Sequence, residues 1–103
     1  FDVAMPGDDA GAFHSSDLWF SFGSLAKCWR PFVGWHYDLA RRMGLYWTNF
    51  AANGDPNGTD RDGTPLPVWD PCIGEECPAM HLCQEPGMRT DWLTETDRKA
   101  FGL

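Results

Sequence analysis

The sequence has few basic residues and no long apolar run. It has eight lysines and arginines against fifteen acidic residues, the formal net charge is −7, and the adjacent basic pairs are Arg41-Arg42 and Arg98-Lys99. With no basic stripe to follow a phosphate backbone, we expect no nucleic-acid partner. The longest apolar run, Leu18 to Phe22, is interrupted by Ser21 and is much shorter than the ~20 residues of a membrane helix. We therefore expect no membrane span.

The start of the sequence lacks an initiating methionine and a signal-peptide pattern. It begins at Phe1, with no charged segment followed by an apolar one. We interpret this start as a cut or processed end and expect further sequence upstream. Nothing in the sequence indicates a cellular compartment.

Cysteines are few, and three of them are close together. The chain has Cys28, Cys72, Cys77 and Cys83, which permit three complete pairings if all are oxidised. His81 lies among the last three, but gaps of four and five residues between these cysteines fit the short Cys-x-x-Cys spacing of zinc sites poorly. We expect no metal and no cofactor; a local disulfide and reduced, buried thiols both remain open.

The chain is rich in aromatic residues for its size. It has 103 residues, enough for one small domain, with 43% hydrophobic residues, six tryptophans and seven phenylalanines. Side chains of this kind are usually buried. We expect them to pack within this chain or against another part of a larger assembly.

The first half of the sequence predicts three elements. A weakly alternating strand over Phe1–Met5 ends at Pro6-Gly7. A short helix is expected over Asp17–Phe22, with Ser15 or Ser16 as its cap and Gly23 as its stop. Apolar residues recur every three or four positions from Gly34 to Asn53, which predicts a long helix with one apolar stripe; its members are Trp35, Leu39, Met43, Tyr46, Trp47 and Phe50.

The second half predicts loops and short elements. Asn53-Gly54 is a typical helix end, and the turn residues that follow continue as a loop to Pro67. Pro67–Pro71 and Ala79–Leu82 are expected to be extended and to pair as a hairpin. Thr94 and Asp97 match a capping box, which predicts a brief helix through Phe101.

One histidine occupies a position suited to chemistry. His14 follows the expected strand and precedes the expected short helix, and open α/β sheets carry their reacting groups at such carboxyl ends of strands. The sequence contains no Gly-x-Ser-x-Gly nucleophile elbow and no glycine-rich oxyanion loop. His14 therefore has no nucleophile within the sequence itself.

Three motifs resemble segments of one enzyme family, in the right order and spacing. GAFHSSDLWFSFG, around His14, resembles the catalytic-histidine segment of type B carboxylesterases and cholinesterase-like lipases. YWTNFAANGDPNG, from Tyr46 to Gly58, and Pro67-Val68-Trp69 resemble the stretches that follow it in that family. The resemblance covers Phe1 to Pro71 well and the remainder weakly.

The resemblance implies an α/β fold. Residues 1–103 would be the C-terminal segment of a single α/β-hydrolase domain: one sheet-edge strand, the catalytic-histidine loop, a long packing helix, a short hairpin and a terminal helix. The rest of the domain is expected upstream or on another chain.

The resemblance also implies a carboxylic-ester hydrolase with a Ser-His-Asp/Glu triad, in which His14 is the general acid/base. The serine and the acid would lie in the N-terminal part of the same enzyme, the expected partner of this chain, and the substrate would be a small ester. The chain alone is then expected to be inactive. A non-catalytic, cholinesterase-like adhesion protein is the alternative, and an independently folded binding module is a third reading.

Neighbours of His14 receive secondary roles. Asp17 is expected to support the His14 loop through backbone amides rather than to serve as the triad acid. In the resembled family the segment after the histidine faces the catalytic centre, so Trp19 and Phe20 are candidates for the substrate pocket, with core packing as the equal alternative. Phe22 is expected in the core.

Three other polar residues are interpreted as structural. His36 lies on the long helix, and His81 lies in the cysteine-rich tail. Asn57-Gly58-Thr59 is a glycosylation sequon, but the turn motif already accounts for Asn57.

Overall fold

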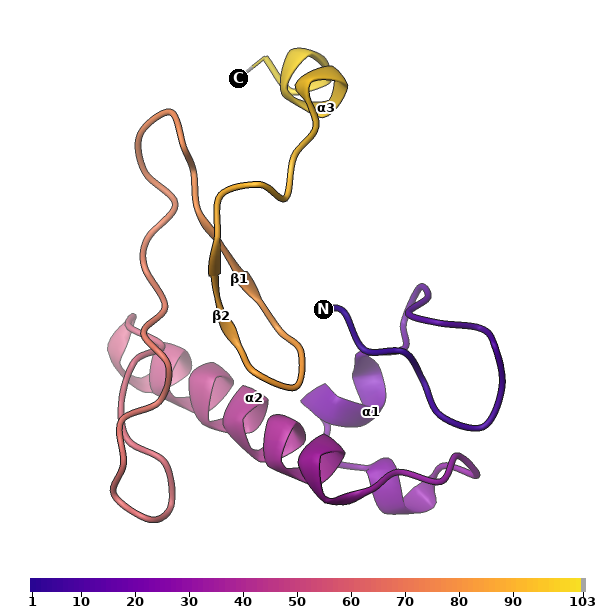
Figure 1. Cartoon of the computed structure of the whole chain (residues 1–103). Helices are drawn as coiled ribbons and strands as arrows, with labels where there is room; N and C mark the ends of the chain where they lie inside the picture. Colours follow the sequence, from indigo (N-terminus) through magenta and orange to yellow (C-terminus); the bar gives the residue numbers. More distant parts are fainter. Residues whose placement is uncertain (103) are drawn as a thin grey trace.

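The computed structural model describes residues 1–102 as two connected parts (Figure 1). The first part contains the N-terminal segment, the short helix α1 (Leu18–Ser21), a 3-10 turn (Leu25–Lys27) and the long helix α2 (Gly34–Asn53). The second part contains a hairpin of β1 (Ala79–His81) and β2 (Gly87–Arg89), followed by α3 (Glu95–Ala100). In Figure 1 the hairpin lies above α2, and α3 lies at the far end of this part. The molecule measures 40 × 35 × 20 Å.

The N-terminal segment is extended but forms no strand, which corrects the expectation for Phe1–Met5. Its alternation is nevertheless real: Val3 and Met5 are buried, and Ala4 is exposed. The Asp2 N–H donates to the Leu82 carbonyl at 2.8 Å. A strand is defined by a ladder of such bonds with a neighbour, and within the described residues no neighbouring strand completes one here.

Helix α1 begins one residue later than expected and has a different cap. Asp17 occupies the N-cap position, and no side chain makes a capping hydrogen bond there, so the expected caps Ser15 and Ser16 are wrong. Gly23 ends the segment in a left-handed conformation, with φ 62°, as expected of a glycine stop. The buried face of α1 packs against α2 through Phe20, whose ring lies edge-on to that of His36 of α2, with ring centres 6.3 Å apart.

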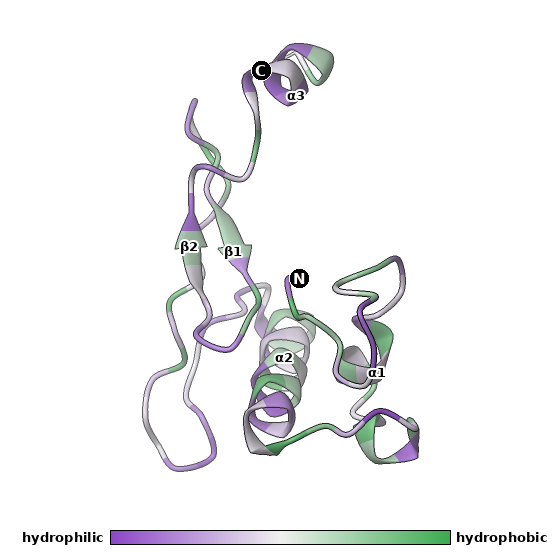
Figure 2. Ribbon diagram, turned by 45° about the vertical axis from the view of Figure 1, so that its right-hand side comes forward, coloured by the Kyte–Doolittle hydropathy of each residue, from purple (hydrophilic) through white to green (hydrophobic). Residues whose placement is uncertain are grey.

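Helix α2 has the bounds that the periodicity predicts. At its N-terminus, His36 Nδ1 accepts a hydrogen bond from the Val33 N–H at 2.9 Å, which satisfies one of the free amides of the first turn. Gly54 ends it with φ 73°. Figure 2 shows hydrophobic residues interspersed with hydrophilic ones along this helix.

The core lies between α2, α1, the N-terminal segment and the hairpin. Leu39, Met43 and Tyr46 of the predicted stripe are almost fully buried, while Trp47 and Phe50 at the end of the stripe are exposed. Residues from distant parts of the sequence complete the core: Val3, Met5, Phe20, Leu25, Ala40, Leu66, Met80 and Leu82. Each Å² of apolar surface removed from water stabilises the folded state by ~25 cal/mol. The burial of this core is therefore the main stabilising contribution to the first part of the molecule.

Three polar contacts attach the loop after α2 to the helix. Asp60 accepts hydrogen bonds from the Arg41 guanidinium at 2.8 and 3.0 Å, and its carboxylate also lies 3.5 Å from Arg42 Nε. The Tyr46 hydroxyl donates to the Pro67 carbonyl at 2.6 Å. These contacts explain how a loop without regular structure follows a fixed path along α2.

The hairpin pairs differently from the sequence expectation. β1 lies antiparallel to β2, with Met80 opposite Met88, and not against Pro67–Pro71. Proline has no N–H to donate to a ladder, and Pro67–Pro71 has a proline at each end. The segment instead passes near the end of α2.

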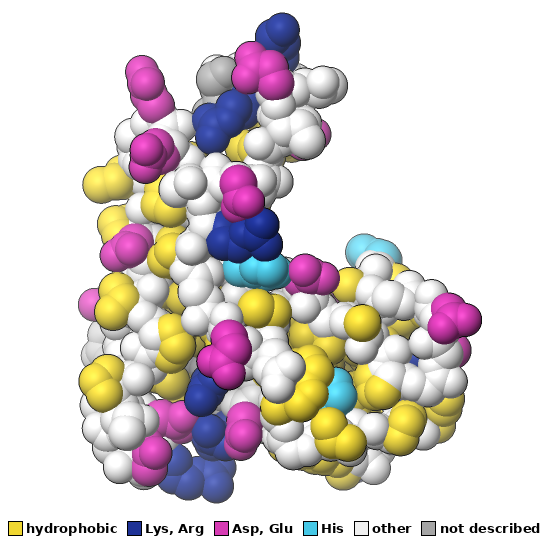
Figure 3. Space-filling view, in the orientation of Figure 1, with side chains coloured by type: hydrophobic (Ala, Val, Ile, Leu, Met, Phe, Trp, Pro, Cys, Tyr) yellow, Lys and Arg dark blue, Asp and Glu magenta, His cyan; other side chains and the backbone are white. Residues whose placement is uncertain are grey.

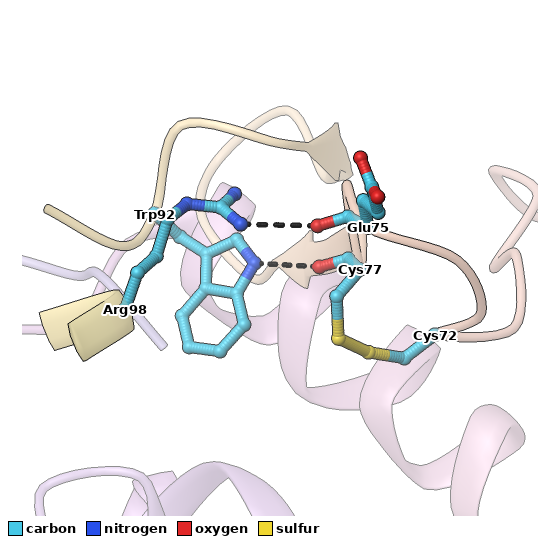
Figure 4. Close-up of a disulfide and its surroundings, with 5 residues drawn as sticks. All are labelled: Cys72, Glu75, Cys77, Trp92 and Arg98. Carbon is cyan, nitrogen blue, oxygen red and sulfur yellow. Dashed lines mark hydrogen bonds between the residues drawn. A yellow bond between two sulfur atoms is a disulfide. The ribbon is translucent and has the colours of Figure 1, made fainter. Parts of the chain in front are cut away.

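The tail that follows β2 is hydrogen-bonded to a disulfide loop that precedes β1 (Figure 4). Cys72 and Cys77 are bonded, whereas Cys28 and Cys83 are free thiols. The Trp92 indole N–H donates to the Cys77 carbonyl at 2.8 Å, and Arg98 of α3 donates to the Glu75 carbonyl at 3.0 Å. The predicted capping box of α3 is present between Thr94 and Asp97.

Candidate functional site

His14 lies in a tight turn between the N-terminal segment and α1. The Ser16 N–H donates to the Phe13 carbonyl at 3.0 Å, and the Phe13 N–H donates back to the Ser16 hydroxyl at 3.2 Å. Ser15, in between, has φ 69°, a left-handed conformation that is uncommon for a residue with a side chain. These two reciprocal bonds fix the backbone on both sides of His14 and point to a local constraint at this position.

The imidazole of His14 is exposed, and among residues 1–102 it makes no hydrogen bond. The other two histidines differ. His36 is 4% exposed and holds the start of α2, and burial lowers the pKa of its imidazole, consistent with a neutral ring that accepts from Val33. His14 is therefore the histidine whose two nitrogens are both open to groups outside the described residues.

His81 takes part in a surface network of charged side chains. Its Nδ1 lies 2.9 Å from Arg89 Nη1, and its Nε2 lies 3.0 Å from Asp2 Oδ2. Because arginine can only donate, Nδ1 is the acceptor and Nε2 carries the proton that Asp2 accepts. His36 and His81 thus have the structural roles that the sequence predicted.

Asp17 lies next to the His14 turn, but its contacts run through the backbone. Its carbonyl accepts from the N–H groups of Phe20 and Ser21 at 3.0 and 2.8 Å, and its carboxylate makes no capping bond. The turn is closed by Ser16 instead, a role that was not among the sequence predictions. The signal was available in the three-residue spacing from Phe13 to Ser16, which suits a serine bonded to a nearby backbone amide.

The aromatic residues after His14 divide into buried and exposed groups. Phe20 is fully buried against Phe1 and Phe32, so it is a core residue and not, in this structure, part of a pocket. Trp19 is 37% exposed on the helix that follows His14. Phe22, expected in the core, is 78% exposed. Figure 3 shows that hydrophobic side chains reach the surface over both parts of the molecule.

A groove of about 660 Å³ lies at the C-terminal end of α2, and His14 is not among its lining residues. Trp47, Phe50, Trp69 and Pro78 provide its apolar walls. Its lining residues with polar side chains are few: Asp55, Asn57 and Asp70. The groove and His14 therefore do not form one site.

The described residues contain no group of three or more histidine, cysteine, aspartate or glutamate side chains placed to hold a metal ion. In the cysteine-rich segment, the Cys72–Cys77 disulfide occupies two of the thiols that a zinc site would need. Over the same residues, no helix combines the length and the apolarity needed to cross a bilayer.

The side-chain amide of Asn57, in the sequon, is hydrogen-bonded to the backbone of Trp69. Its Oδ1 accepts from the Trp69 N–H at 2.6 Å and its Nδ2 donates to the Trp69 carbonyl at 2.9 Å. Nδ2 is the atom that a glycan would modify. The turn interpretation of Asn57 is consistent with these contacts.

Comparison with known proteins places the chain in a family. The model of the carboxylesterase family matches residues 2–100. The chain is 33% identical over 85 residues to acetylcholinesterase of Gallus gallus, with 78% of the chain and 11% of that protein covered. It is 34% identical over 85 residues to cocaine esterase of Homo sapiens, with 75% and 13% covered. It is 29% identical over 91 residues to bile salt-activated lipase of Homo sapiens, with 81% and 12% covered.

The family model extends the likeness to the hairpin and all of α3, where the sequence motifs were weak. The chain spans about a tenth of the length of these relatives. Its short hairpin and three helices are accordingly a fragment of an α/β-hydrolase. The chain belongs to the carboxylesterase family.

Proposed function

We propose that this chain supplies the general acid/base of a carboxylic-ester hydrolase, and that His14 is that residue. The family supports ester hydrolysis in general. The observation that carries the role of His14 is its setting: a constrained turn holds the backbone, while the imidazole is exposed and makes no hydrogen bond to the described residues. A triad histidine needs both ring nitrogens for partners, one for the nucleophile and one for the acid.

In this mechanism His14 first accepts a proton as general base and then donates it as general acid. It takes the proton from the serine hydroxyl as the oxygen attacks the ester carbonyl, and it returns the proton to the alcohol oxygen as the carbon–oxygen bond breaks. A water molecule then repeats the sequence to release the carboxylic acid. The serine, the acid and the oxyanion donors come from the N-terminal part of the enzyme, so the chain alone is inactive.

Two neighbours of His14 have supporting roles in this proposal. Trp19, which is exposed, contributes to the substrate pocket that the rest of the domain completes, while Phe20 is buried in the core. Asp17, at the N-cap of α1, supports the His14 loop through backbone amides. The substrate is a small-molecule ester.

The test uses the complete enzyme that carries this chain. His14→Ala and His14→Gln are expected to lower kcat for p-nitrophenyl acetate about a thousandfold or more, with little change in melting temperature. His81→Gln is the matched control, because His81 contacts Asp2 and Arg89 and has no role in the chemistry. A His14→Ala enzyme with wild-type turnover would refute the proposal.

Covalent labelling separates the enzyme from the adhesion protein. An organophosphate reacts rapidly with a serine that a triad activates and very slowly with an ordinary serine. We expect stoichiometric labelling of the wild-type enzyme and greatly slowed labelling of His14→Ala. A wild-type protein that resists labelling and hydrolyses no ester would be the non-catalytic relative instead.

A further inference from the structure

We propose that Arg30 is a positioning residue for His14. This inference rests on the proposed function and assigns a role to a side chain that no sequence motif indicated. Arg30 lies sixteen residues after His14, beyond α1 and the 3-10 turn. Arg30 contacts the beginning of the loop that carries His14, and it also contacts Phe13, the residue immediately before His14.

The segment in question, called here the His14 loop, spans residues 6–16. Its first half closes on itself, because the Met5 N–H donates to the Gly11 carbonyl at 3.1 Å and the Ala10 N–H donates to Asp8 Oδ1 at 3.1 Å. In Figure 1 it forms the wide loop at the right-hand edge. The loop contributes few side chains to the core, so its position depends on contacts made from outside it.

Arg30 provides polar contacts to the beginning of the loop. Its Nη1 donates to the Pro6 carbonyl at 3.1 Å and to Asp8 Oδ1 at 2.8 Å. The Arg30 side chain is 10% exposed, whereas that of Asp8 is 44% exposed. The Arg30 guanidinium also holds the pKa of the Asp8 carboxyl below its usual range. The arginine is thus enclosed by the loop rather than free in solvent.

The same guanidinium also contacts the end of the loop. Its central carbon lies 5.3 Å from the ring centre of Phe13 and 4.6 Å from that of Trp29. Both distances fall in the range of attractive contacts between a cation and an aromatic ring. Arg30 therefore connects Pro6 and Asp8 to Phe13 across the width of the loop.

A close backbone approach reinforces this arrangement. Gly7 has φ 105°, and a Cβ added there would lie 2.8 Å from the Trp29 ring and 3.2 Å from Pro31. The loop thus rests directly on the Trp29-Arg30-Pro31 segment, and only a glycine fits.

Phe13 transmits this constraint to His14. Its ring lies against Arg30, and its N–H and carbonyl are both bonded to Ser16. His14 is the next residue, so a displacement of Phe13 displaces the imidazole. A misplacement of about 1 Å in a reacting group can cost about a hundredfold in rate. The Asp8 carboxylate is 44% exposed, and an ion pair with a solvent-exposed partner contributes little to global stability. The effect of Arg30 is therefore expected in the geometry of the loop.

The test compares arginine variants of the complete enzyme by two readouts. Arg30→Met is expected to lower kcat for p-nitrophenyl acetate by about 10- to 100-fold with KM within about twofold. It is also expected to speed amide hydrogen exchange in residues 7–14, measured by mass spectrometry. Arg30→Lys keeps the charge beside Asp8 but lacks the planar group that contacts two rings, so partial recovery of both values is expected.

Arg41→Met is the matched control. Like Arg30, Arg41 is paired with acidic side chains, in its case the carboxylates of Asp38 and Asp60, but it lies on the polar face of α2. We expect its loss to lower the melting temperature while kcat and exchange in residues 7–14 stay within about twofold of wild type. If Arg30→Met behaves in the same way as Arg41→Met, Arg30 is merely structural and the inference is wrong.

The outcomes distinguish this inference from the proposed function. An active His14→Ala enzyme contradicts the proposed function, and the catalytic part of the present inference with it, whatever the Arg30 variants do. An inactive His14→Ala enzyme together with wild-type kcat in Arg30→Met contradicts the role of Arg30 alone. Faster exchange in residues 7–14 tests the contact between Arg30 and the loop without reference to activity.

Discussion

The side chain of Asn57 pairs with the backbone of Trp69 as another strand would. It accepts from the Trp69 N–H at 2.6 Å and donates to the Trp69 carbonyl at 2.9 Å, across twelve residues of loop. Trp69 in turn lies edge-on to Tyr46 of α2, with ring centres 5.2 Å apart. One amide side chain therefore holds the returning loop against the long helix.

Replacing Asn57 with alanine leaves both backbone groups of Trp69 without these partners. We expect a loss of about 1–3 kcal/mol, seen as a lower melting temperature in a thermal scan of the enzyme. Asn53→Ala is the control, because Asn53 is exposed at the end of α2, and it should change stability by less than about 0.5 kcal/mol. Equal melting temperatures for the two variants would contradict the pairing.

Asp60 gives a pH-dependent contribution to stability. Hydrogen bonds from Arg41, and further contacts with the Arg61 N–H and Arg42, hold the pKa of its carboxyl well below the usual value. A lowered folded-state pKa stabilises the protein fully above the unfolded-state pKa of about 3.9, and the contribution disappears as the pH falls through the folded-state value.

The corresponding variant is Asp60→Asn. We expect it to be less stable than wild type by about 1.5–3 kcal/mol at pH 7, since it loses charged hydrogen bonds. The difference should shrink below about pH 4, as measured by urea titrations at pH 7, 5 and 3. A difference that is constant over this range would show that the carboxylate charge is not the cause.

The two tyrosines on α2 form a matched pair for testing a buried hydrogen bond. Tyr46 is fully buried and its hydroxyl donates to the Pro67 carbonyl at 2.6 Å, whereas Tyr37 is 45% exposed. Tyr46→Phe should lower the free energy of unfolding by about 1 kcal/mol, and Tyr37→Phe by much less. Comparable effects in thermal scans of both variants would mean that the Pro67 carbonyl finds another donor.

Two glycines, one inside α2 and one directly after its last residue, should respond to alanine in opposite directions. Gly54 has φ 73° at the end of the helix, where a Cβ is strained, so Gly54→Ala should destabilise by about 1 kcal/mol. Gly44 is inside the helix and a Cβ there would meet no neighbouring atom within 4 Å, so Gly44→Ala should stabilise by about 0.5–1 kcal/mol. Thermal scans of the two variants check both signs.

Local patterns predicted the elements that depend on local interactions. The period of Leu39, Met43 and Tyr46, together with Gly54, gave the bounds of α2, and the Thr94–Asp97 capping box gave the start of α3. These features are set within a few residues of chain.

Pairings between distant segments were not predictable in the same way. The expected strand at Phe1–Met5 lacks a ladder partner among the described residues, and Ala79–His81 pairs with Gly87–Arg89 rather than with Pro67–Pro71. The sequence also gave no indication of Arg30, because its contacts with Asp8 and Phe13 depend on the path of the chain through α1. His14 itself was found through its neighbours, which resemble a family motif.

The hydrogen bond from the Asp2 N–H to the Leu82 carbonyl has a consequence for biosynthesis. Val3 and Met5 are covered by a core that includes Met80 and Leu82, and the nearby Asp2–His81 contact spans 79 residues of sequence. At translation rates of about 5–20 residues per second, the ribosome needs roughly 4–16 s to make that stretch. During this interval Val3 and Met5 are not yet covered by Met80 and Leu82. A nascent chain paused before Met80 therefore exposes an apolar surface that chaperones can bind.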